Sequence, residues 1–468
     1  MILGGYAAIL GYIFLLIFGI GPLVQKFSDL ETSRKVIHTM LFVVWILLTA
    51  FFRDTVHQII IPVLFIILNL LSYRFHIYAS VEREEDNHFG TVYFAIVVTA
   101  VMTFVYFFPE YYAYSGIAIF CLTFGDGFAA MIGYHVRSKS LLAHKSLAGF
   151  LSCGAASFLS VLAFCLVYSV PFSLLQILVI GVLAAILELC EAGMDNFSVT
   201  IGVFLVCLGF HHAADATFLV GLILGIAVFL PVFLSRSIDL YGSLLALGMV
   251  VSFYCLGGVF ALTVLLLAYG TIAVISRIRK KRLGKKEHGR GFLQILINGG
   301  FSTLAMVAYG LIGHKGLLIV SLVAVGGCFV DSVSSDVGTL SRKAPHDILR
   351  RKPVPAGLSG GVSLLGTVCA LVASAAIAAA TVWQLALNWT DGLIMTALIF
   401  GQSVLDSLLG SGLQVKYRCA VCGELTEEKT HCDLAALRHS GLSWMDNNMV
   451  NFLSSLAVTL AALAIFWR

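Results

Sequence analysis

The sequence predicts an all-α, polytopic integral membrane protein with about 14–17 transmembrane helices in two tandem helical bundles. Hydrophobic residues make up 59% of the 468 positions and charged residues 12%, whereas soluble domains carry about 25% charged residues. Predominantly apolar runs near the length of about 20 residues that a bilayer requires also recur along the chain. A single soluble core is therefore excluded, and lipid is the expected solvent of most helices.

The apolar runs predict about sixteen helices. In chain order they cover 2–24, 36–52, 57–73, 91–108, 112–134, 146–169, 172–190, 198–210, 216–234, 240–253, 254–276, 291–312, 316–331, 357–382, 390–410 and 447–466. The runs at 198–210 and 240–253 are short, which favours tilted or re-entrant segments. The first run has neither a basic region before it nor a small-residue cleavage site, so it is expected to be a retained span.

The charges predict a topology. With the N-terminus outside, the basic clusters of the loops 25–35, 135–145, 277–290 and 332–356 all fall inside, as the positive-inside rule requires. The run at 277–290 is therefore interpreted as a loop against anionic lipid headgroups, and nucleic acid is not an expected partner. The expected location is a bacterial plasma membrane with the active loops in the cytoplasm.

This topology has a direct test. Single cysteines introduced at Lys139 and at Arg350 are expected to react with a membrane-impermeant thiol reagent from the same side of the membrane. Labelling from opposite sides would contradict the predicted arrangement of the loops.

The polar motifs divide the chain into two parts. One group lies between residues 31 and 198 and a second between 290 and 451, with a motif-poor stretch around Arg236 between them. We expect two membrane domains, at 1–235 and 236–468.

The first group centres on a carboxylate inside an apolar run, Asp126 between Gly125 and Gly127. An ionisable residue at membrane depth is costly and marks a candidate functional site. Glycines on both sides would let a ligand approach the backbone closely, although Asp beside Gly is also common in turns.

Further polar residues at helix ends accompany this carboxylate. They are Arg34, Lys35, His38, Lys145, Ser146, Glu188, Glu191, Asp195 and Asn196. Carboxylates that hold Mg²⁺, together with cations that neutralise phosphates, are the groups that phosphoryl transfer requires. Each basic residue alone would also fit a simple helix anchor.

Five motifs in this order resemble the membrane polyprenol kinases, a family that includes dolichol kinase, phytol kinase and CTP-dependent diacylglycerol kinase. They are Arg34-Lys35-x-x-His38, His88 to Phe94, Gly125 to Gly133, Lys145-Ser146-x-x-Gly149 and Asp195-Asn196. The resemblance covers about residues 25–235 and implies a nucleotide-dependent lipid-alcohol kinase, often using CTP, that lacks a P-loop. Phe197-Ser198 departs from the Leu-Thr typical of phytol kinases.

The resemblance assigns roles to these residues. Asp126 and Asp195 would hold Mg²⁺ or orient the substrate hydroxyl, and His38 would belong to the same catalytic group. Arg34, Lys35 and Lys145 would bind the nucleotide phosphates. Gly125, Gly127, Ser146 and Asn196 would complete the nucleotide site.

The second group begins at a cytoplasmic helix end, where Asp331 and Asp336 suit a divalent cation. Asp406 is a third candidate ligand. The candidate phosphate-binding residues of this group are Lys343, Arg350, Lys352, Gly360, Gly361, Asn447 and Asn451. Gly360 and Gly361 belong to a Gly/Ser-rich turn before a predicted helix, which can present backbone N–H groups to a phosphate or be an ordinary loop.

Residues 236–468 as a whole resemble a transmembrane family, long without a known function, that contains plant phytyl-phosphate kinase. The resemblance implies transfer of a second phosphoryl group onto a prenyl monophosphate.

One polar loop carries Cys419, Cys422, His431 and Cys432. The C-x-x-C spacing is typical of zinc sites, although adjacent His431 and Cys432 do not easily ligate one ion. Structural zinc, redox chemistry and unligated thiols all stay open. Most of the remaining cysteines lie in apolar runs, where a thiol behaves as a small hydrophobe.

These observations together predict a membrane lipid kinase. It would phosphorylate a prenyl alcohol such as phytol or geranylgeraniol with CTP or ATP and Mg²⁺, and then the monophosphate to the diphosphate. Its partners would be prenyl alcohols, prenyl phosphates, a nucleoside triphosphate and membrane lipids. The alternatives are a CTP-dependent diacylglycerol kinase, a phosphatidate cytidylyltransferase-like enzyme, and a transporter, whose carboxylates would lie nearer the bilayer midplane.

Overall fold

The chain divides into two compact units, Met1–Asp215 and Ala216–Arg468, each of which is described by itself. The structure is a computed structural model that describes residues 2–75, 90–141, 145–189, 195–212, 215–235, 237–283, 291–432 and 434–468. The predicted motif residues His88 and Phe89, together with Glu191 and Arg236, lie outside the described residues.

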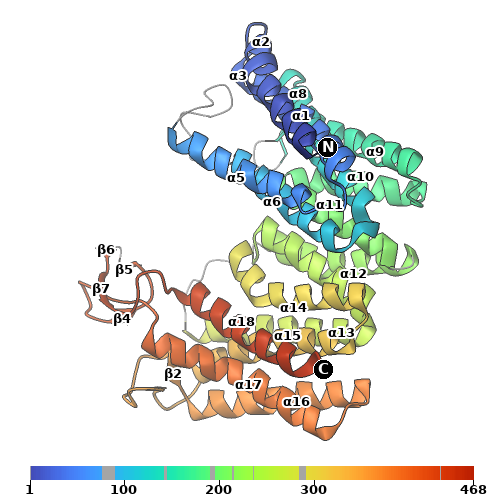
Figure 1. The fold of residues 1–468 in the computed structure, drawn as a ribbon. Coiled ribbons are helices and arrows are strands. Elements are labelled where there is room, and N and C mark those ends of the chain that lie inside the picture. The colour runs from blue at the N-terminus through green and yellow to red at the C-terminus, as the bar shows by residue number, and fades with distance from the viewer. Residues whose placement is uncertain are drawn as a thin grey trace. The chain divides into compact units, whose positions relative to one another are not determined.

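The first unit is built from helices in its described residues, with an isolated β-bridge between Ser140 and Ser146 (Figure 1). Its elements are α1 (Ile2–Phe14), η1 (Leu15–Ile20), α2 (Gly21–Gln25), α3 (Leu30–Met40), α4 (Phe42–Phe52), α5 (His57–Phe75), α6 (Gly90–Phe107), η2 (Pro109–Tyr111), α7 (Tyr112–Phe120), η3 (Cys121–Asp126), α8 (Gly127–His135), α9 (Leu147–Tyr168), α10 (Leu174–Glu188) and α11 (Asp195–His212).

Side-chain caps set the starts of several of these helices. Asp29 accepts a 2.7 Å hydrogen bond from the backbone N–H of Thr32 at the start of α3. Ser173 and Gln176 form a reciprocal capping box at the start of α10. Such caps satisfy backbone donors that a helix leaves unpaired at its first turn, so the chain enters each helix at a defined residue.

The second unit contains seven helices and seven short strands in its described residues. They are α12 (Asp215–Leu234), α13 (Leu240–Leu283), α14 (Phe292–Ile312), α15 (Lys315–Gly338), β1 (His346–Asp347), β2 (Gly361–Val362), α16 (Leu364–Leu385), α17 (Trp389–Gly412), β3 (Lys416–Arg418), β4 (Leu425–Thr426), β5 (Thr430–His431), β6 (Leu434–Ala435), β7 (Leu437–Ser440) and α18 (Asn447–Phe466). The strands pair antiparallel as β1–β2, β4–β3–β7 and β5–β6.

Helix α15 is the centre of the second unit. It contacts α13, α14, α16, α17 and α18, and Figure 1 shows these helices side by side. In its membrane-length window 83% of the residues are buried, because α15 is apolar or small on all sides until its last turns. Its polar C-terminal end, which carries Asp331 and Asp336, is therefore brought into the interior of the bundle.

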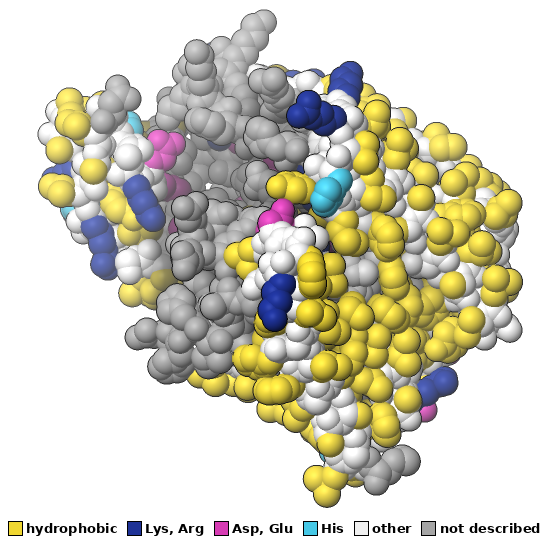
Figure 2. Space-filling model, turned by 90° about the horizontal axis from the view of Figure 1, so that it is seen from above, with side chains coloured by type: hydrophobic (Ala, Val, Ile, Leu, Met, Phe, Trp, Pro, Cys, Tyr) yellow, Lys and Arg dark blue, Asp and Glu magenta, His cyan; other side chains and the backbone are white. Residues whose placement is uncertain are grey.

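The prediction of an all-α integral membrane protein is confirmed. Among the described residues, twelve helices are long and apolar enough to cross a membrane, and two shorter apolar helices accompany them. Large hydrophobic side chains also lie open at the surface, such as Leu3 at 86% and Trp383 at 88% exposure. Figure 2 shows such side chains over much of one face. A soluble protein rarely exposes so wide an apolar surface.

Helix α13 contains a break that the sequence anticipates. Gly258 has φ 72° and ψ −171°, which interrupts the helix inside the predicted span 254–276, near the boundary expected between residues 253 and 254. An unbroken helix of 44 residues would be about 66 Å long, roughly twice the hydrocarbon thickness. Residues of both halves belong to one buried hydrophobic cluster.

Three predicted boundaries differ from the structure. The division between the units falls at residues 215/216 instead of 235, because α12 packs on α13, with Gly221 against Tyr254 and Cys255. The predicted helix start at 357 is wrong: α16 begins at Leu364, and β2 occupies part of the preceding segment. Helix α15 continues past residue 331 to Gly338.

Candidate functional site

The centre of the first unit is an ion pair across two helices. Lys35 on α3 donates hydrogen bonds of 2.7 Å to both carboxylate oxygens of Asp126. The Nε2 atom of His38, one helical turn after Lys35, lies 3.3 Å from Oδ2 of the same carboxylate. Asp126 is buried and its two partners are partly buried, so the carboxylate is held in one orientation.

The local backbone explains how Asp126 reaches this position. It ends the π-helical segment η3, and single π-helical turns are rare and frequent at functional sites. A Cβ atom on Gly127 would lie 1.9 Å from Thr39 Oγ1, and one on Gly125 would lie 2.8 Å from Ser157 Oγ. The structure thus gives both glycines a role in close helix contact, and their contact with nucleotide stays a prediction.

A second ion pair of the same unit connects the residue Lys145, just before α9, with the end of α10. Lys145, just before α9, donates 2.5 Å hydrogen bonds to Oε1 and to the backbone oxygen of Glu188, and its Nζ lies 3.6 Å from Asp195 Oδ2. Burial opposes charging of Lys145, but the carboxylates of Glu188 and Asp195 outweigh it and raise its pKa above the usual value. Lys145 is therefore a fixed cation at neutral pH.

The two ion pairs act on one another electrostatically. The charge of Lys145 interacts with Asp126, and the charges of Asp126 and Lys35 interact with Asp195. We call Lys35, His38, Asp126, Lys145, Glu188 and Asp195 the first-unit charge cluster. Segments that are far apart in the sequence thus supply one group of buried cations and carboxylates.

Three other predicted residues have structural partners. Arg34 pairs with Glu31 at 2.9 Å, Ser146 caps α9 by accepting from Gly149 N, and Asn196 donates a 3.1 Å hydrogen bond to Gly90 O. Their roles in nucleotide binding stay predictions. Glu188 was not among the predicted catalytic residues, and only its position near Asp195 in the sequence pointed to it.

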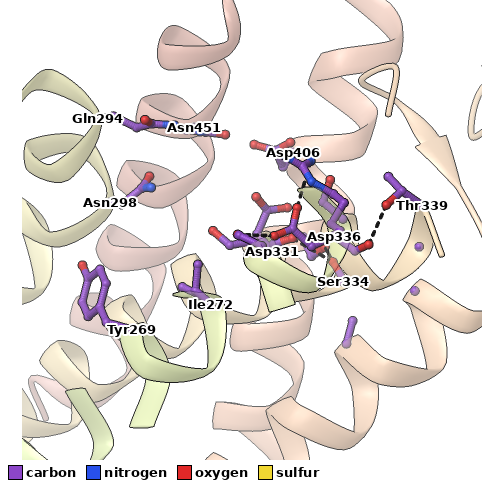
Figure 3. Close-up of a pocket in the computed structure, with 18 of the residues that line it drawn as sticks. Tyr269, Ile272, Gln294, Asn298, Asp331, Ser334, Asp336, Thr339, Asp406 and Asn451 are labelled. Carbon is purple, nitrogen blue, oxygen red and sulfur yellow. Dashed lines mark hydrogen bonds and ion pairs between the residues drawn. The ribbon is translucent and has the colours of Figure 1, made fainter. Parts of the chain in front are cut away.

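The second unit contains a cavity of about 970 Å³. One part is apolar and is lined by residues of α12, α13, α14 and the link between α12 and α13, which include Phe229, Ile238, Met249, Val250, Leu265 and Ile295. The other part is polar and includes Asp331, Asp336, Asp406, Asn298, Asn447 and Asn451. Figure 3 shows Asp331, Asp336 and Asp406 close together, with Gln294, Asn298 and Asn451 across from them. The cavity therefore suits a ligand with a polar head and an apolar tail.

Asp336 is held by two residues of α13. Arg279 Nη1 lies 3.0 Å from Oδ1, and Ser276 donates a 2.5 Å hydrogen bond to Oδ2. The prediction that Arg279 belongs to a loop against lipid headgroups is wrong, because this residue lies in α13 and pairs with Asp336. No local pattern links Arg279 to Asp336, since the pairing depends on how α13 crosses α15.

Asp331 and Asp406 face the same cavity from α15 and α17. Asp406 Oδ2 accepts a 3.4 Å hydrogen bond from Ser454, and the hydroxyls of Ser334 and Ser403 bond each other at 3.0 Å between the two helices. Two carboxylates that approach each other at one polar end provide the hard oxygen ligands that Mg²⁺ prefers. The donor set of this cavity therefore fits Mg²⁺, whereas Asp126 already has both oxygens bonded to Lys35.

The segment before α16 brings glycines, and not the predicted cations, to the cavity. Gly360 and Gly361 line it, as do Asn447 and Asn451. Lys343, Arg350 and Lys352 are exposed and are absent from its lining. Asp347 of β1 accepts hydrogen bonds from Arg350 N at 2.7 Å and from Ser411 Oγ at 2.7 Å, while Ile348 and Gly357 to Gly360 of the segment between β1 and β2 do line the cavity.

A glycine substitution tests this cavity wall. Gly360 has φ 83°, and a Cβ there would lie 2.5 Å from the backbone N of Ser411. Gly360→Ala is therefore expected to destabilise the protein by about 3 kcal/mol or more. Gly357 also has a positive φ, but its nearest atom would be 3.9 Å away, so Gly357→Ala is expected to cost about 1 kcal/mol.

Thermal unfolding of both variants in detergent compares the two costs. Equal losses of stability would show that Gly360 does not make the close contact with Ser411.

The predicted soft ligands lie in the loop between α17 and α18. Atoms of Cys419, Cys422, His431 and Cys432 are all within 4.8 Å of one another, and the three cysteines are free thiols. The predicted zinc site thus has its four candidate ligands in one place, and zinc itself stays a prediction.

Comparison with known proteins supports a membrane family. Residues 222–459 match the family described as Integral membrane protein DUF92. The chain is 29% identical over 223 residues to Protein PGR of Arabidopsis thaliana, covering 42% of this chain and 76% of that protein. It is 30% identical over 132 residues to Phytol kinase of Synechocystis sp., covering 28% of this chain and 54% of that enzyme, so it spans about half of that relative.

No solved structure matches this chain. The family match lies within the second unit and includes the residues that line the cavity. Since it covers more than half of the sequence, the chain belongs to the DUF92 family of integral membrane proteins.

Proposed function

We propose that this protein is a membrane kinase that phosphorylates a prenyl alcohol such as phytol or geranylgeraniol, with CTP or ATP as the donor. The observation that carries the proposal is the first-unit charge cluster, in which Lys35, His38 and Lys145 surround Asp126 and Asp195. The similarity to a phytol kinase supports the substrate class.

The cluster offers the groups that phosphoryl transfer needs. Asp126, fixed by Lys35, would accept the proton of the substrate hydroxyl or orient that hydroxyl, while Lys35 and Lys145 would neutralise charge on the transferred phosphoryl group. Such catalysis depends mainly on positioning and charge stabilisation. Asp195 is the candidate ligand in this unit for Mg²⁺, which would supply positive charge to neutralise the donor phosphates.

We further propose that the cavity of the second unit phosphorylates the prenyl monophosphate to the diphosphate. Its apolar part would hold the prenyl chain, and its polar part would hold the phosphate head. A volume of about 970 Å³ lies at the upper end of the range of about 300–1,000 Å³ for ligand sites. Asp331 and Asp406 would hold Mg²⁺, and Arg279 fixes Asp336 beside them.

A product assay tests both steps. The purified protein is incubated with phytol or geranylgeraniol, Mg²⁺ and CTP or ATP labelled on the γ-phosphate, and the lipids are separated. Labelled monophosphate is expected first, followed by diphosphate. Label in lipid from γ-labelled but not from α-labelled CTP would separate a kinase from a cytidylyltransferase. When diacylglycerol is added as well, label in phosphatidate and in no prenyl phosphate would support the diacylglycerol kinase alternative.

The assay also has an outcome that ends the proposal. If no prenyl alcohol and no prenyl phosphate acquires label with either nucleotide, while the protein remains folded, the kinase function is wrong. Uptake of unmodified prenol into sealed vesicles would then favour a transporter.

A further inference from the structure

The loop between α17 and α18 gathers four metal-binding side chains at one point. Among the described residues, Cys419, Cys422, His431 and Cys432 have ligand atoms that all lie within 4.8 Å of one another. His431 Nδ1 lies 3.5 Å from Cys422 Sγ and 3.4 Å from Cys432 Sγ. In a tetrahedral zinc site, Zn–S and Zn–N bonds of about 2.3 and 2.0 Å place such atoms roughly 3.5 Å apart.

The backbone around the first two cysteines has the shape of a metal-binding turn. Cys419 and Gly423 close it, since Gly423 N donates to Cys419 O at 3.0 Å and Cys419 N to Glu424 O at 2.9 Å. Gly423 has φ 73°, which glycine adopts without strain. The N–H of Val421 points at Cys419 Sγ at 3.4 Å, and such donors stabilise the thiolate that binds metal.

In the sequence, the adjacency of His431 and Cys432 counts against their binding one shared ion. Consecutive residues of a strand point to opposite faces, and His431 ends β5. Cys432, however, has φ 53°, a left-handed conformation that is uncommon for a residue with a side chain. That turn brings Cys432 Sγ back beside His431 Nδ1. A redox pair would need only two thiols and would not explain a histidine and a third cysteine held at the same point.

The same loop is attached to the cavity of the second unit. Glu427, between the two ligand pairs, accepts hydrogen bonds from Ser359 N at 2.6 Å and Gln414 Nε2 at 2.8 Å. Lys416 Nζ donates to Ser359 O at 2.9 Å. Ser359 and Glu428 both line the cavity. The loop is thus fixed to the cavity wall through both backbone groups of Ser359.

We propose that Cys419, Cys422, His431 and Cys432 bind one structural Zn²⁺, and that this ion holds the loop so that Glu427 and Lys416 keep Ser359 in place at the cavity. Four protein ligands leave no open position, which is the arrangement of structural zinc. Short strands of two to four residues form little hydrophobic core of their own, so a metal would supply much of the order of this loop.

Elemental analysis of the untagged full-length protein, purified in detergent from zinc-supplemented cells, tests the metal site. About one zinc per chain is expected. Zinc content is expected to fall at least about tenfold in Cys422→Ser and in a Cys422→Ser/His431→Ala double variant. The matched control, Cys369→Ser, alters a free thiol in α16 and is expected to keep its zinc.

Two results would overturn the metal site. One is wild-type protein with less than about one zinc in ten chains, and the other is undiminished zinc in the folded double variant. If the variants do not fold, Co²⁺ exchanged into wild-type protein reports the ligands, because tetrahedral thiolate coordination gives intense visible absorption. An octahedral Co²⁺ spectrum would contradict the site.

Hydrogen exchange of the segment 355–363 tests the link to the cavity. Removal of zinc by a chelator is expected to speed exchange of the Ser359 amide at least about tenfold, because Glu427 no longer holds it. Glu427→Gln is expected to speed the same exchange while zinc content stays unchanged. Exchange that is insensitive to both changes would overturn the link, independently of any lipid kinase activity.

Discussion

Replacement of Asp126 by asparagine is expected to lower formation of the prenyl monophosphate by at least about a thousandfold. The amide side chain of this variant would be neutral, so it could neither accept the hydroxyl proton nor keep Lys35 in its present orientation, where Nζ is 2.7 Å from both carboxylate oxygens. Phosphorylation of added prenyl monophosphate in the second unit is expected to continue. Both rates are measured with the same labelled nucleotide in one preparation.

Stability has to be separated from chemistry in this experiment. Loss of one partner of a buried ion pair costs about 3–5 kcal/mol, since Lys35 would remain buried without its carboxylate. The double variant Asp126→Asn/Lys35→Met removes both charges and is expected to recover much of the lost stability without recovering activity. Asp54→Asn changes an exposed carboxylate and is expected to leave both rates unchanged. Activity that returns with stability in the double variant would show that Asp126 has only a structural role.

Replacement of Asp331 by asparagine is expected to have the opposite pattern. Formation of the diphosphate should fall by at least about a thousandfold, because one of the two carboxylates proposed to hold Mg²⁺ would be replaced by a neutral amide. Formation of the monophosphate should persist, since Asp331 belongs to the other compact unit. The monophosphate is therefore expected to accumulate, and its ratio to diphosphate is the measurement.

Asp391→Asn is the matched control for this change in the second unit. Asp391 lies in the first turn of α17, about four turns before Asp406 on the same helix, and is not part of the cavity lining. The variant is expected to make diphosphate at the normal rate. Equal loss of both steps in Asp331→Asn, with the protein still folded, would contradict the assignment of the two reactions to two units.

The amino-acid sequence alone predicts that lipid surrounds most of the helices, and it predicts most of the helices themselves. Apolar runs of membrane length indicate helices that contact lipid, because in hydrocarbon each backbone group must form its hydrogen bond within its own helix. A division of this helix was expected at residues 253/254 for the same reason, since one bilayer cannot contain a helix of 44 residues, and the structure has the break at Gly258. Isolated carboxylates such as Asp126 and Asp331 were visible as candidates because charge at membrane depth is rare.

The tertiary structure decided which charges meet. Pairing of Lys35 with Asp126 or of Arg279 with Asp336 depends on how helices distant in the sequence cross, and sequence spacing carries no record of a crossing. Lys343, Arg350 and Lys352 are exposed and do not line the cavity, so their predicted contact with phosphate stays a prediction.

In the cysteine loop, too, the sequence identified some of the ligands and only the structure brought all four together. Spacing alone identified Cys419 and Cys422 as a ligand pair, but it counted against adjacent His431 and Cys432. Only the backbone conformation at Cys432, with φ 53°, brings the fourth ligand to the others. Local composition therefore determined where this protein meets lipid and which residues carry charge, whereas long-range helix contacts and single backbone torsions decided which of those residues share a site.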